Sequence, residues 1–421
     1  ALFSNTTASN NTAIGYNTLY SNSTGTQNTA VGRASLFSNS TADNNTAVGY
    51  NALFANTTGT YNIAVGSHAL DANTTANNNI AVGYNAMTAN TTGASNTALG
   101  SSALTASNGS SNVAVGDVSL YANTTGSNNT AVGTYSLYSN TTASNNTAVG
   151  YDALGDCTTG FSNVAVGHNA MNALTDADEN TAIGKDALGS LTTGNYNTAI
   201  GFESLASATT STQLVAVGRH ALYSNTTGTQ VTACGYSALY ANTTGNSNTA
   251  FGYAALITNT TGSANVAVGR DALYYNNGSS NTAVGHQAME DNTTGSENTA
   301  LGYNTLDANT TASYNTALGY HCLTSNTTGS QNTAVGRAAL QDNVTGDFNT
   351  AVGYNSLINN TGSSNVAVGR ASLTSNTTGS RNVAVGRDSL ILNSTGTQNV
   401  AVGAYALDAV TTGSENVAIG D

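Results

Sequence analysis

Residues 11–27 read NTAIGYNTLYSNSTGTQ, and the same 17-residue unit returns along the whole chain. A glycine that follows alanine and an apolar residue marks each copy, from Gly15 and Gly32 to Gly403 and Gly420. The chain has 25 such glycines, and of the 24 intervals between them 21 are 17 residues and three are 16. A fixed period of this length is typical of a solenoid, in which each repeat forms one coil.

We number the consensus N-T-A-V-G-Y-N-A-L-Y-S-N-T-T-G-S-N as repeat positions 1 to 17. Two apolar pieces, at positions 2–4 and 8–9, lie between pieces rich in Gly and Asn, so each copy predicts two short strands and two turns. The three short copies lose their residue in the N-T-T-G piece, as a turn allows. Asn, Thr and Gly are poor helix formers, and no helical periodicity is present. The sequence predicts an all-β parallel β-solenoid of 25 coils, with one repeat per coil.

The repeats run through residues 1–421, so we expect a single continuous solenoid region. Its first and last coils are incomplete and lack a polar cap, and solenoids need capping coils to remain soluble. We therefore expect the chain to be a segment of a longer fibre protein.

The composition excludes several classes of protein. The chain has no Pro, no Trp, 45 Gly and only 7% charged residues, and its net charge of −13 is spread without runs of either sign. Nucleic acid binding needs a basic stripe, and membrane insertion needs about 20 apolar residues in succession. Neither pattern is present, so we expect no nucleic acid partner and no membrane insertion.

Asparagine is almost constant at positions 12 and 1, and its exceptions come in blocks. Position 12 is apolar in four consecutive coils, and position 1 in two, Leu214 and Val231. A ladder of stacked amides would explain this, because an amide beside an apolar neighbour loses its partner. Duplication of a substituted repeat is the alternative. The predicted ladder residues are Asn22, Asn39, Asn56, Asn73 and Asn90 at position 12, and Asn11, Asn28 and Asn45 at position 1.

The apolar positions predict the interior of the coils. Position 9 is Leu or Met in every copy, position 4 is nearly always Val, Ile or Leu, and position 2 alternates Thr with Val or Ile. We expect positions 2, 4 and 9 to face inward, and the predicted core includes Leu19, Leu36, Leu53, Val31 and Val48.

Position 3 is Ala in all 25 copies and lies on the opposite face of the strand from positions 2 and 4. If those two positions face inward, the alanines face outward, where no larger residue is accepted. We expect another chain, or another part of this one, to pack against this stripe, which includes Ala13, Ala30, Ala47 and Ala64.

Position 6 predicts a variable outward stripe that holds nine of the tyrosines and seven of the eight basic residues. Rows of Tyr and Arg could bind glycans or a partner, or could form a solvated flank that buries its side-chain stems. The candidate binding residues are Tyr16, Arg33, Tyr50 and Tyr84.

The core motif, for example Asn146-Thr147-Ala148-Val149-Gly150, resembles the S-V-A-I-G-x-x-A repeats in the head domains of trimeric autotransporter adhesins. The Asn-rich version with N-T-T-G turns is also similar to repeats in bacteriophage tail fibres and tailspikes. The resemblance covers the whole chain, although this repeat is about three residues longer than that of the adhesins. It implies a left-handed β-roll, a homotrimer or other fibre assembly, and an extracellular location on a cell surface or a virion.

No group of residues predicts catalysis or a cofactor. A uniform repeat places the same residue in every layer, whereas catalysis needs different groups in one place. The five histidines lie on separate coils, and the three cysteines lie too far apart for disulfides. Asp176, Asp178 and Glu179 could hold calcium or form an exposed acidic turn. We expect no enzyme activity.

The leading functional hypothesis is a structural fibre shaft, which would act as a stiff spacer and as a host-attachment surface. At about 4.8 Å per coil the solenoid would extend roughly 120 Å. The alternative is a solenoid that binds glycans, ice or another surface through outward Tyr and Arg rows or Thr rows.

Overall fold

The computed structural model describes residues 1–421 and contains 25 β-strands and no helix. Every strand is three residues long and occupies positions 2–4 of its repeat, so each repeat contributes one strand. The predicted all-β parallel β-solenoid with one repeat per coil is confirmed. The chain divides into two compact units, Ala1–Gln213 and Leu214–Asp421, which we describe separately.

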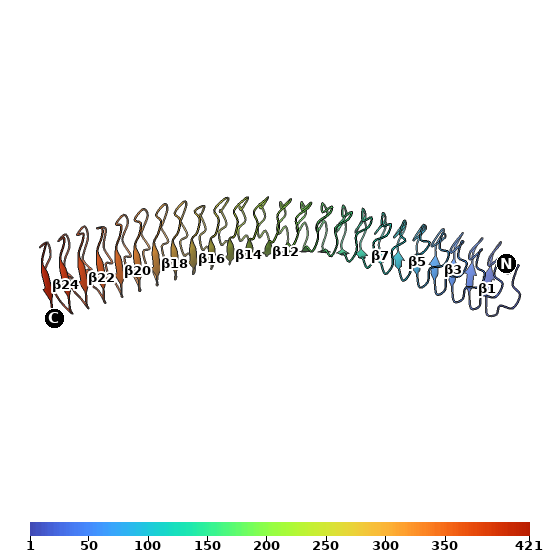
Figure 1. The fold of residues 1–421 in the computed structure, drawn as a ribbon, viewed down its shortest axis with the longest axis horizontal. Coiled ribbons are helices and arrows are strands. Elements are labelled where there is room, and N and C mark those ends of the chain that lie inside the picture. The colour runs from blue at the N-terminus through green and yellow to red at the C-terminus, as the bar shows by residue number, and fades with distance from the viewer. The chain divides into compact units, whose positions relative to one another are not determined.

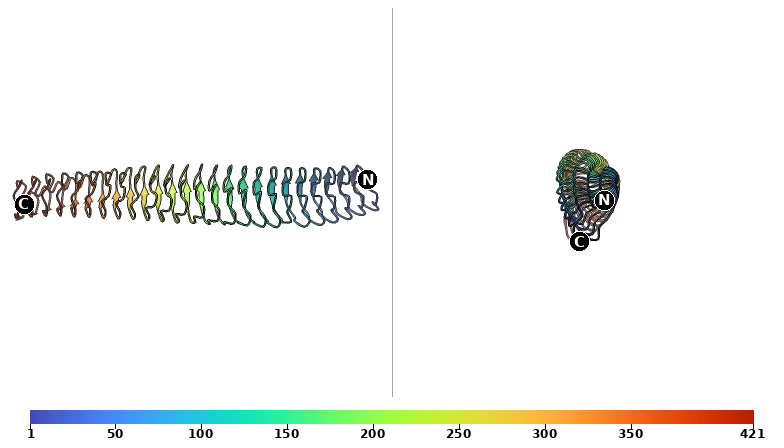
Figure 2. Two further views of the ribbon diagram at one scale, coloured as in Figure 1. Left: turned by 90° about the horizontal axis from the view of Figure 1, so that it is seen from above. Right: turned by 90° about the vertical axis from the view of Figure 1, so that its right-hand side faces the viewer.

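In each unit, successive coils lie side by side in single file with their strands aligned (Figures 1 and 2). The strands of the first unit are β1 (Thr12–Ile14), β2 (Thr29–Val31), β3 (Thr46–Val48), β4 (Ile63–Val65), β5 (Ile80–Val82), β6 (Thr97–Leu99), β7 (Val113–Val115), β8 (Thr130–Val132), β9 (Thr147–Val149), β10 (Val164–Val166), β11 (Thr181–Ile183) and β12 (Thr198–Ile200). The strands of the second unit are β13 (Val215–Val217), β14 (Thr232–Cys234), β15 (Thr249–Phe251), β16 (Val266–Val268), β17 (Thr282–Val284), β18 (Thr299–Leu301), β19 (Thr316–Leu318), β20 (Thr333–Val335), β21 (Thr350–Val352), β22 (Val366–Val368), β23 (Val383–Val385), β24 (Val400–Val402) and β25 (Val417–Ile419).

Neighbouring strands pair in parallel and in one fixed register. Position 3 of each strand lies beside position 3 of the next, as Ala13 does beside Ala30 and Ala216 beside Ala233. The ladder of backbone hydrogen bonds continues outside the strands, for example from Ser38 N to the carbonyl of Phe54. Equivalent residues of successive coils therefore form continuous columns in each unit.

The glycine at position 5 ends each strand. These glycines adopt φ values of 129° to 148°, a region that side-chain-bearing residues rarely occupy. A Cβ there would also overlap the carbonyl oxygen of the equivalent glycine in the next coil, as at Gly150 against Gly167. These two constraints explain why all 25 copies keep glycine.

The second predicted strand, at positions 8 and 9, is not formed. The backbone there is a series of turns, and positions 7 and 9 both have positive φ, as at Asn17 (54°) and Leu19 (48°). A strand would send Thr18 and Leu19 to opposite faces. Both side chains are fully buried, so the chain needs the left-handed turns to turn both inward.

The orientation predicted for the strand was wrong. The stripe alanines Ala30, Ala47 and Ala64 are fully buried inside the coil, and Ala13 in the first coil is half-buried. The predicted core residues Val31 and Val48 are instead partly exposed. The reason is the narrow interior, which Leu at position 9 and the two asparagines already fill, so only a methyl group fits on the facing strand. The alanine stripe is therefore part of the core and cannot contact another chain.

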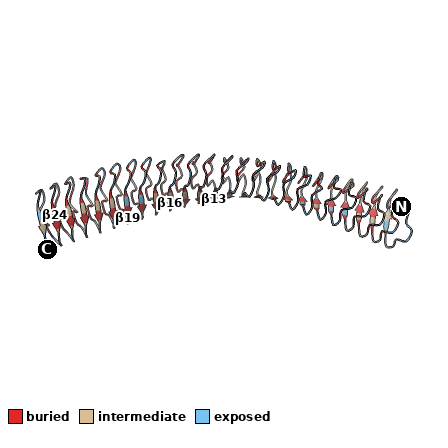
Figure 3. Cartoon of the chain, in the orientation of Figure 1, coloured by how far each residue is buried: buried red, intermediate tan, exposed pale blue.

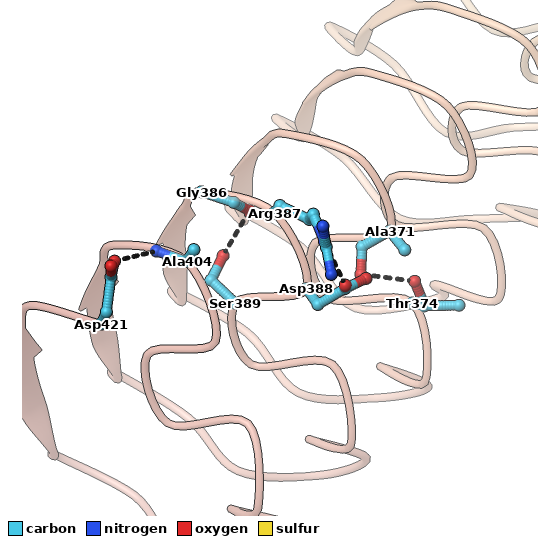
Figure 4. Close-up of polar contacts among 8 residues, drawn as sticks. All are labelled: Ala371, Thr374, Gly386, Arg387, Asp388, Ser389, Ala404 and Asp421. Atoms are coloured by element: carbon cyan, nitrogen blue, oxygen red, sulfur yellow. Dashed lines mark hydrogen bonds and ion pairs between the residues drawn. The ribbon is translucent and has the colours of Figure 1, made fainter.

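Each coil has the same small core. Position 9 is fully buried, as predicted for Leu19, Leu36 and Leu53, and small residues at position 8 lie beside it. Buried residues recur from coil to coil along each unit (Figure 3). Hydroxyls at position 8 donate to backbone carbonyls, as Ser389 Oγ does to Gly386 O at 3.1 Å (Figure 4).

The three short coils keep the register. In the coil that contains Ser107, one residue is missing from the turn, yet β6 and β7 pair in the normal way. Ser107 replaces Asn at position 12, is fully buried, and accepts a hydrogen bond from Asn123 Nδ2 at 2.9 Å. The deletion is absorbed within the turn, as predicted.

Candidate functional site

The candidate functional surfaces are columns of equivalent side chains that run along each unit. Two columns of asparagine lie inside the coils, and three kinds of column lie outside: the strand residues at positions 2 and 4, the aromatic and basic residues at position 6, and the threonines of the turn.

The position-12 column is a ladder of side-chain amides. Asn39 Nδ2 donates to Asn22 Oδ1 at 2.8 Å, Asn56 to Asn39 at 3.0 Å, and Asn73 to Asn56 at 2.9 Å. Asn90 continues the series, with Nδ2 3.2 Å from Asn73 Oδ1. All five predicted residues, from Asn22 to Asn90, take part in this ladder, and all five are fully buried. The predicted asparagine ladder is confirmed here.

The position-1 column forms a second ladder with a different geometry. The Oδ1 atom of Asn11 accepts from the backbone N–H of Asn28 at 2.9 Å, and Asn28 Oδ1 accepts from Asn45 N at 3.0 Å. The link is thus mainly from side chain to backbone, whereas the sequence had predicted amide to amide.

Both asparagines of a coil hold the same turn. Asn28 Nδ2 donates to the carbonyl of Ala42 at 2.8 Å, and Asn39 Nδ2 donates to the same carbonyl at 3.0 Å. The next coil repeats this arrangement at Gly59, with Asn45 and Asn56 as donors at 2.8 and 2.9 Å. Each coil is therefore braced across its interior, and each ladder also links it to its neighbour.

The position-12 ladder ends with an unsatisfied carbonyl. The Oδ1 atoms of Asn140 and Asn393 are buried and have no hydrogen-bond partner, and the next coils carry Cys157 and Val410 at this position. Neither side chain offers an amide donor. The four consecutive replacements Cys157, Leu174, Leu191 and Ala208 are all fully buried.

We define the strand face as the outward side chains at positions 2 and 4 of every coil. These residues are half-buried or exposed throughout both units, and the larger ones are well exposed, such as Phe251 and Leu301 at 44%. Cys234 lies on this face and is partly exposed. The face is a continuous uncharged strip within each unit, apolar at position 4 and Thr, Val or Ile at position 2. The sequence prediction missed it because it placed these side chains inside.

The position-6 column is exposed, as predicted for Tyr16, Arg33, Tyr50 and Tyr84. Many of its members stack on one another: Arg33 lies over the Tyr50 ring at 5.7 Å, and Tyr236 and Tyr253 stack at 5.3 Å. Stacked rings cover one another's faces, which are the surfaces that a sugar ring would need. Where such stacks form, they stabilise the stack of coils by cation–π and aromatic contacts.

Charged groups in these columns pair mainly with neighbours in the same coil. Arg387 Nε lies 3.0 Å from Asp388 Oδ2, next to the Thr374 hydroxyl that donates to Ala371 O at 2.6 Å (Figure 4). The Lys185 ammonium pairs with Asp186 in the same way. Exposed pairs of this kind contribute little to stability.

The acidic residues form no metal site. No group of three or more His, Cys, Asp or Glu residues is placed to hold a metal ion. Asp178 Oδ1 instead accepts from the backbone N–H of Phe161 at 2.9 Å, in the neighbouring coil. Asp307 is the most perturbed carboxyl: burial, together with the nearby charges of Glu290 and Asp291, raises its pKa to about 6.

The thiols show no sign of activation. Burial raises the pKa of Cys157 and of Cys322 to about 12, and it also raises the pKa of Cys234. All three cysteines are free. A thiol whose pKa is raised is mostly protonated at neutral pH and is a poor nucleophile.

Comparison with protein-family models gives no match, and comparison with curated proteins gives no similar protein. The comparisons thus identify neither adhesin repeats nor tail-fibre repeats in this chain. No helix is long and apolar enough to cross a bilayer. The fold defines the class: a parallel β-solenoid with tandem repeats, internal asparagine ladders and an uncharged strand face.

Proposed function

We propose that the chain is a structural shaft segment, a stiff and non-catalytic spacer in an extracellular appendage of a cell surface or a virion. The observation that carries the proposal is the axial repetition of contacts. Each coil donates and accepts the same backbone hydrogen bonds, and in most coils two asparagines link it to its neighbours.

These contacts favour stiffness for a physical reason. Bending a stack of coils lengthens the axial hydrogen bonds on one side, and the buried amides on that side have no water to replace the partner they lose. Because the ladder amides are fully buried, a bend would cost free energy in every coil. A shaft that holds a domain away from a surface needs this property.

The absence of catalysis is part of the proposal. A repeating coil places equivalent residues at every level, which favours columns of similar groups over a single centre that combines a general acid, a base and a substrate pocket. Glycan cleavage that disappears on replacing Asp176 and Asp178 would contradict it.

The shaft role can be tested by imaging the native fibre. Cryo-electron microscopy should give an axial rise of about 4.8 Å per coil. Atomic force microscopy of the same fibres should show segments that keep one constant shape over the length of each unit, on the order of 55 Å for 12 coils. Fibres that bend sharply within such a segment would contradict the spacer role, while the rise alone tests the solenoid.

A second candidate function rests on one observation. Thr occupies position 2 in 15 of the 25 coils and there lies on the outward face of a strand, whereas Thr at position 13 donates to the next coil, as Thr57 Oγ1 does to Thr74 O at 3.0 Å. A regular Thr array on strands is what binding to ice or another flat surface would need. Measuring thermal hysteresis, and binding to immobilised glycans, tests this candidate.

A further inference from the structure

We propose that copies of this chain pack against one another through the strand face, with all copies pointing in the same direction and equivalent coils at the same level. The proposal concerns assembly and goes beyond the shaft role. It replaces the alanine stripe, which is buried in the core, with a different surface for self-association.

The first argument is the composition of the strand face. In all 25 coils, positions 2 and 4 hold only Thr, Val, Ile, Leu, Phe or Cys, and never a charged residue. The 29 charged residues of the chain all lie at other positions of the repeat. Strand faces in contact with water normally carry polar and charged side chains, and exposed apolar patches of this extent mark interaction sites. The face is thus suited to an uncharged, largely apolar partner.

The second argument is compensation of apolar bulk within a coil. Ten coils have Val or Ile at position 2, and nine of these have Val at position 4. Eight coils have Ile, Leu or Phe at position 4, and seven of these have Thr at position 2. Side chains two residues apart on a strand are separated by about 6.6 Å, so direct crowding within the strand is weak. A shared layer of limited volume at each level explains the compensation.

The third argument fixes the direction of the copies. If copies are related by rotation about an axis parallel to the stack of coils, position 2 of one copy faces position 4 of another at the same level. Copies that run in opposite directions would place position 2 against position 2 of a different coil. Only the first arrangement links the sizes of the two positions within one coil. Rotation of this kind gives a closed assembly with either two or three copies.

The fourth argument is area. A three-residue strand is about 10 Å long and each coil rises about 4.8 Å, which gives roughly 50 Å² of face per coil. The 25 coils together provide roughly 1,200 Å², about half from each unit, where a stable interface needs about 800 Å² from each partner. Tyr and Arg at position 6 border the face, and such residues are enriched in interfaces.

An ordered surface such as ice fits the same face less well. Position 4 varies from Val to Leu301, Leu318 and Phe251, so the outward rows are uneven in height. A crystal lattice would favour identical side chains in every coil. A second copy of the chain offers the matching unevenness at each level.

The first experiment measures the mass of the chain in solution by sedimentation equilibrium. We expect a multiple of the 42.1 kDa of one chain. A variant with four lysines on the strand face should sediment as a single chain with an unchanged circular dichroism spectrum: Thr130→Lys, Thr147→Lys, Thr181→Lys and Thr198→Lys. The matched control places the four lysines at exposed turn positions of the same region and should keep the assembly: Thr142→Lys, Thr159→Lys, Thr193→Lys and Thr210→Lys.

The second experiment tests direction and level. A spin label on Ser101→Cys, at the exposed border of the face, is introduced in a Cys234→Ser background, in which the two remaining cysteines are buried. Pulsed electron paramagnetic resonance should give one narrow distance of a few tens of Å between equivalent labels, because packed sheets lie about 10 Å apart. Opposite directions would move the labels many coils apart.

A single-chain mass for the unmodified protein would overturn the proposal, and thermal hysteresis from that single chain would assign the face to ice. Assembly that survives the face lysines, or labels that lie far apart, would overturn it as well. None of these outcomes affects the shaft role, since a single solenoid can be stiff.

Discussion

At the scale of single residues, the asparagine ladder shows where free energy is lost when its pattern is broken. An Asn inside the ladder has a donor on one side and an acceptor on the other, and only the last one leaves an oxygen unsatisfied, as Asn140 and Asn393 do. An unsatisfied buried carbonyl costs about 1–3 kcal/mol. This free-energy cost arises only at the end of the ladder. A block of four apolar residues therefore destabilises the chain little more than a single apolar residue does. This explains the blocks that the sequence shows.

We predict that Asn56→Leu destabilises the chain by about 2 kcal/mol, because Asn39 Oδ1 loses the 3.0 Å hydrogen bond that it accepts. Adding Asn73→Leu should cost clearly less than the first substitution, since it moves the end of the ladder without creating a new one. A double-mutant cycle on chemical denaturation measures the difference. Equal and additive costs would mean that the amides act independently.

The glycine at position 5 leads to a second prediction. Gly150→Ala should destabilise the chain by about 2–4 kcal/mol, because its φ of 138° and the carbonyl of Gly167 both oppose a Cβ. Gly189→Ala is the matched control, because the next coil carries Ala206 at the same position and no positive φ is involved. Thermal unfolding followed by circular dichroism compares the two, and a similar loss in both would contradict the argument.

The Asp307 carboxyl gives a prediction about pH. Its folded pKa of about 6 lies above the value of about 3.9 expected in the unfolded chain. The folded state therefore holds the proton more tightly, and this group lowers stability progressively as the pH rises from about 4 to 6. Asp307→Asn should raise the melting temperature at pH 8 and leave it unchanged near pH 4. An equal effect at both values would rule out a titration origin; Asp408→Asn, at an exposed site, serves as the control.

At the scale of the element, each strand places one residue inward and two outward, and substitutions can check this. Ala148→Val should cost about 1–3 kcal/mol by overpacking a closed interior, whereas Val149→Thr, on the strand face, should cost little in a single chain. Chemical denaturation of variants held as single chains by the face lysines gives both values. A larger loss of stability from Val149→Thr than from Ala148→Val would support the orientation expected from the sequence, with Val149 inside the coil.

Much of the coil could be predicted from the sequence. The 17-residue period predicts one coil per repeat, the Leu or Met at position 9 predicts its core, and the blocks of exceptions predict the ladders. The orientation of the strand could not be predicted, because T-A-V places one small residue between two larger ones, and burial of the larger pair is the usual expectation. What reverses it is the space left inside the coil, and that depends on Leu19, Asn22 and the turns at positions 7 and 9, which bring both apolar residues of the second segment inward.

The candidate surface could be predicted only in part for the same reason. The exposure of position 6 was apparent from its variability, but the stacking of Arg33 on Tyr50 depends on the register between coils. The absence of charge at positions 2 and 4 was visible in the sequence. A core and an interface both exclude charge, so this absence indicates a core if the side chains face inward and an interface if they face outward.

At the scale of the whole molecule, the important property is that a coil contacts only its neighbours. Deleting Thr130 to Asn146, one full repeat within the first unit, should therefore preserve the fold and change the melting temperature little, because Asn129 then precedes Thr147 in the normal motif. Deleting only Thr130 to Leu137 should unfold the neighbouring coils, since position 1 would meet position 10. Hydrogen exchange of both variants locates the affected coils, and equal protection would mean that register is not essential.

The unsatisfied oxygens of Asn140 and Asn393 have a consequence for how such a chain can change over generations. Each marks a boundary between coils with stacked amides and coils with apolar residues at position 12. The free-energy cost lies at this boundary, and moving the boundary by one coil costs almost nothing. Substitutions at such a boundary should therefore be nearly neutral, whereas the same substitution deep inside either region would create two new boundaries. Apolar regions of the interior would accordingly grow and shrink from their edges, one coil at a time.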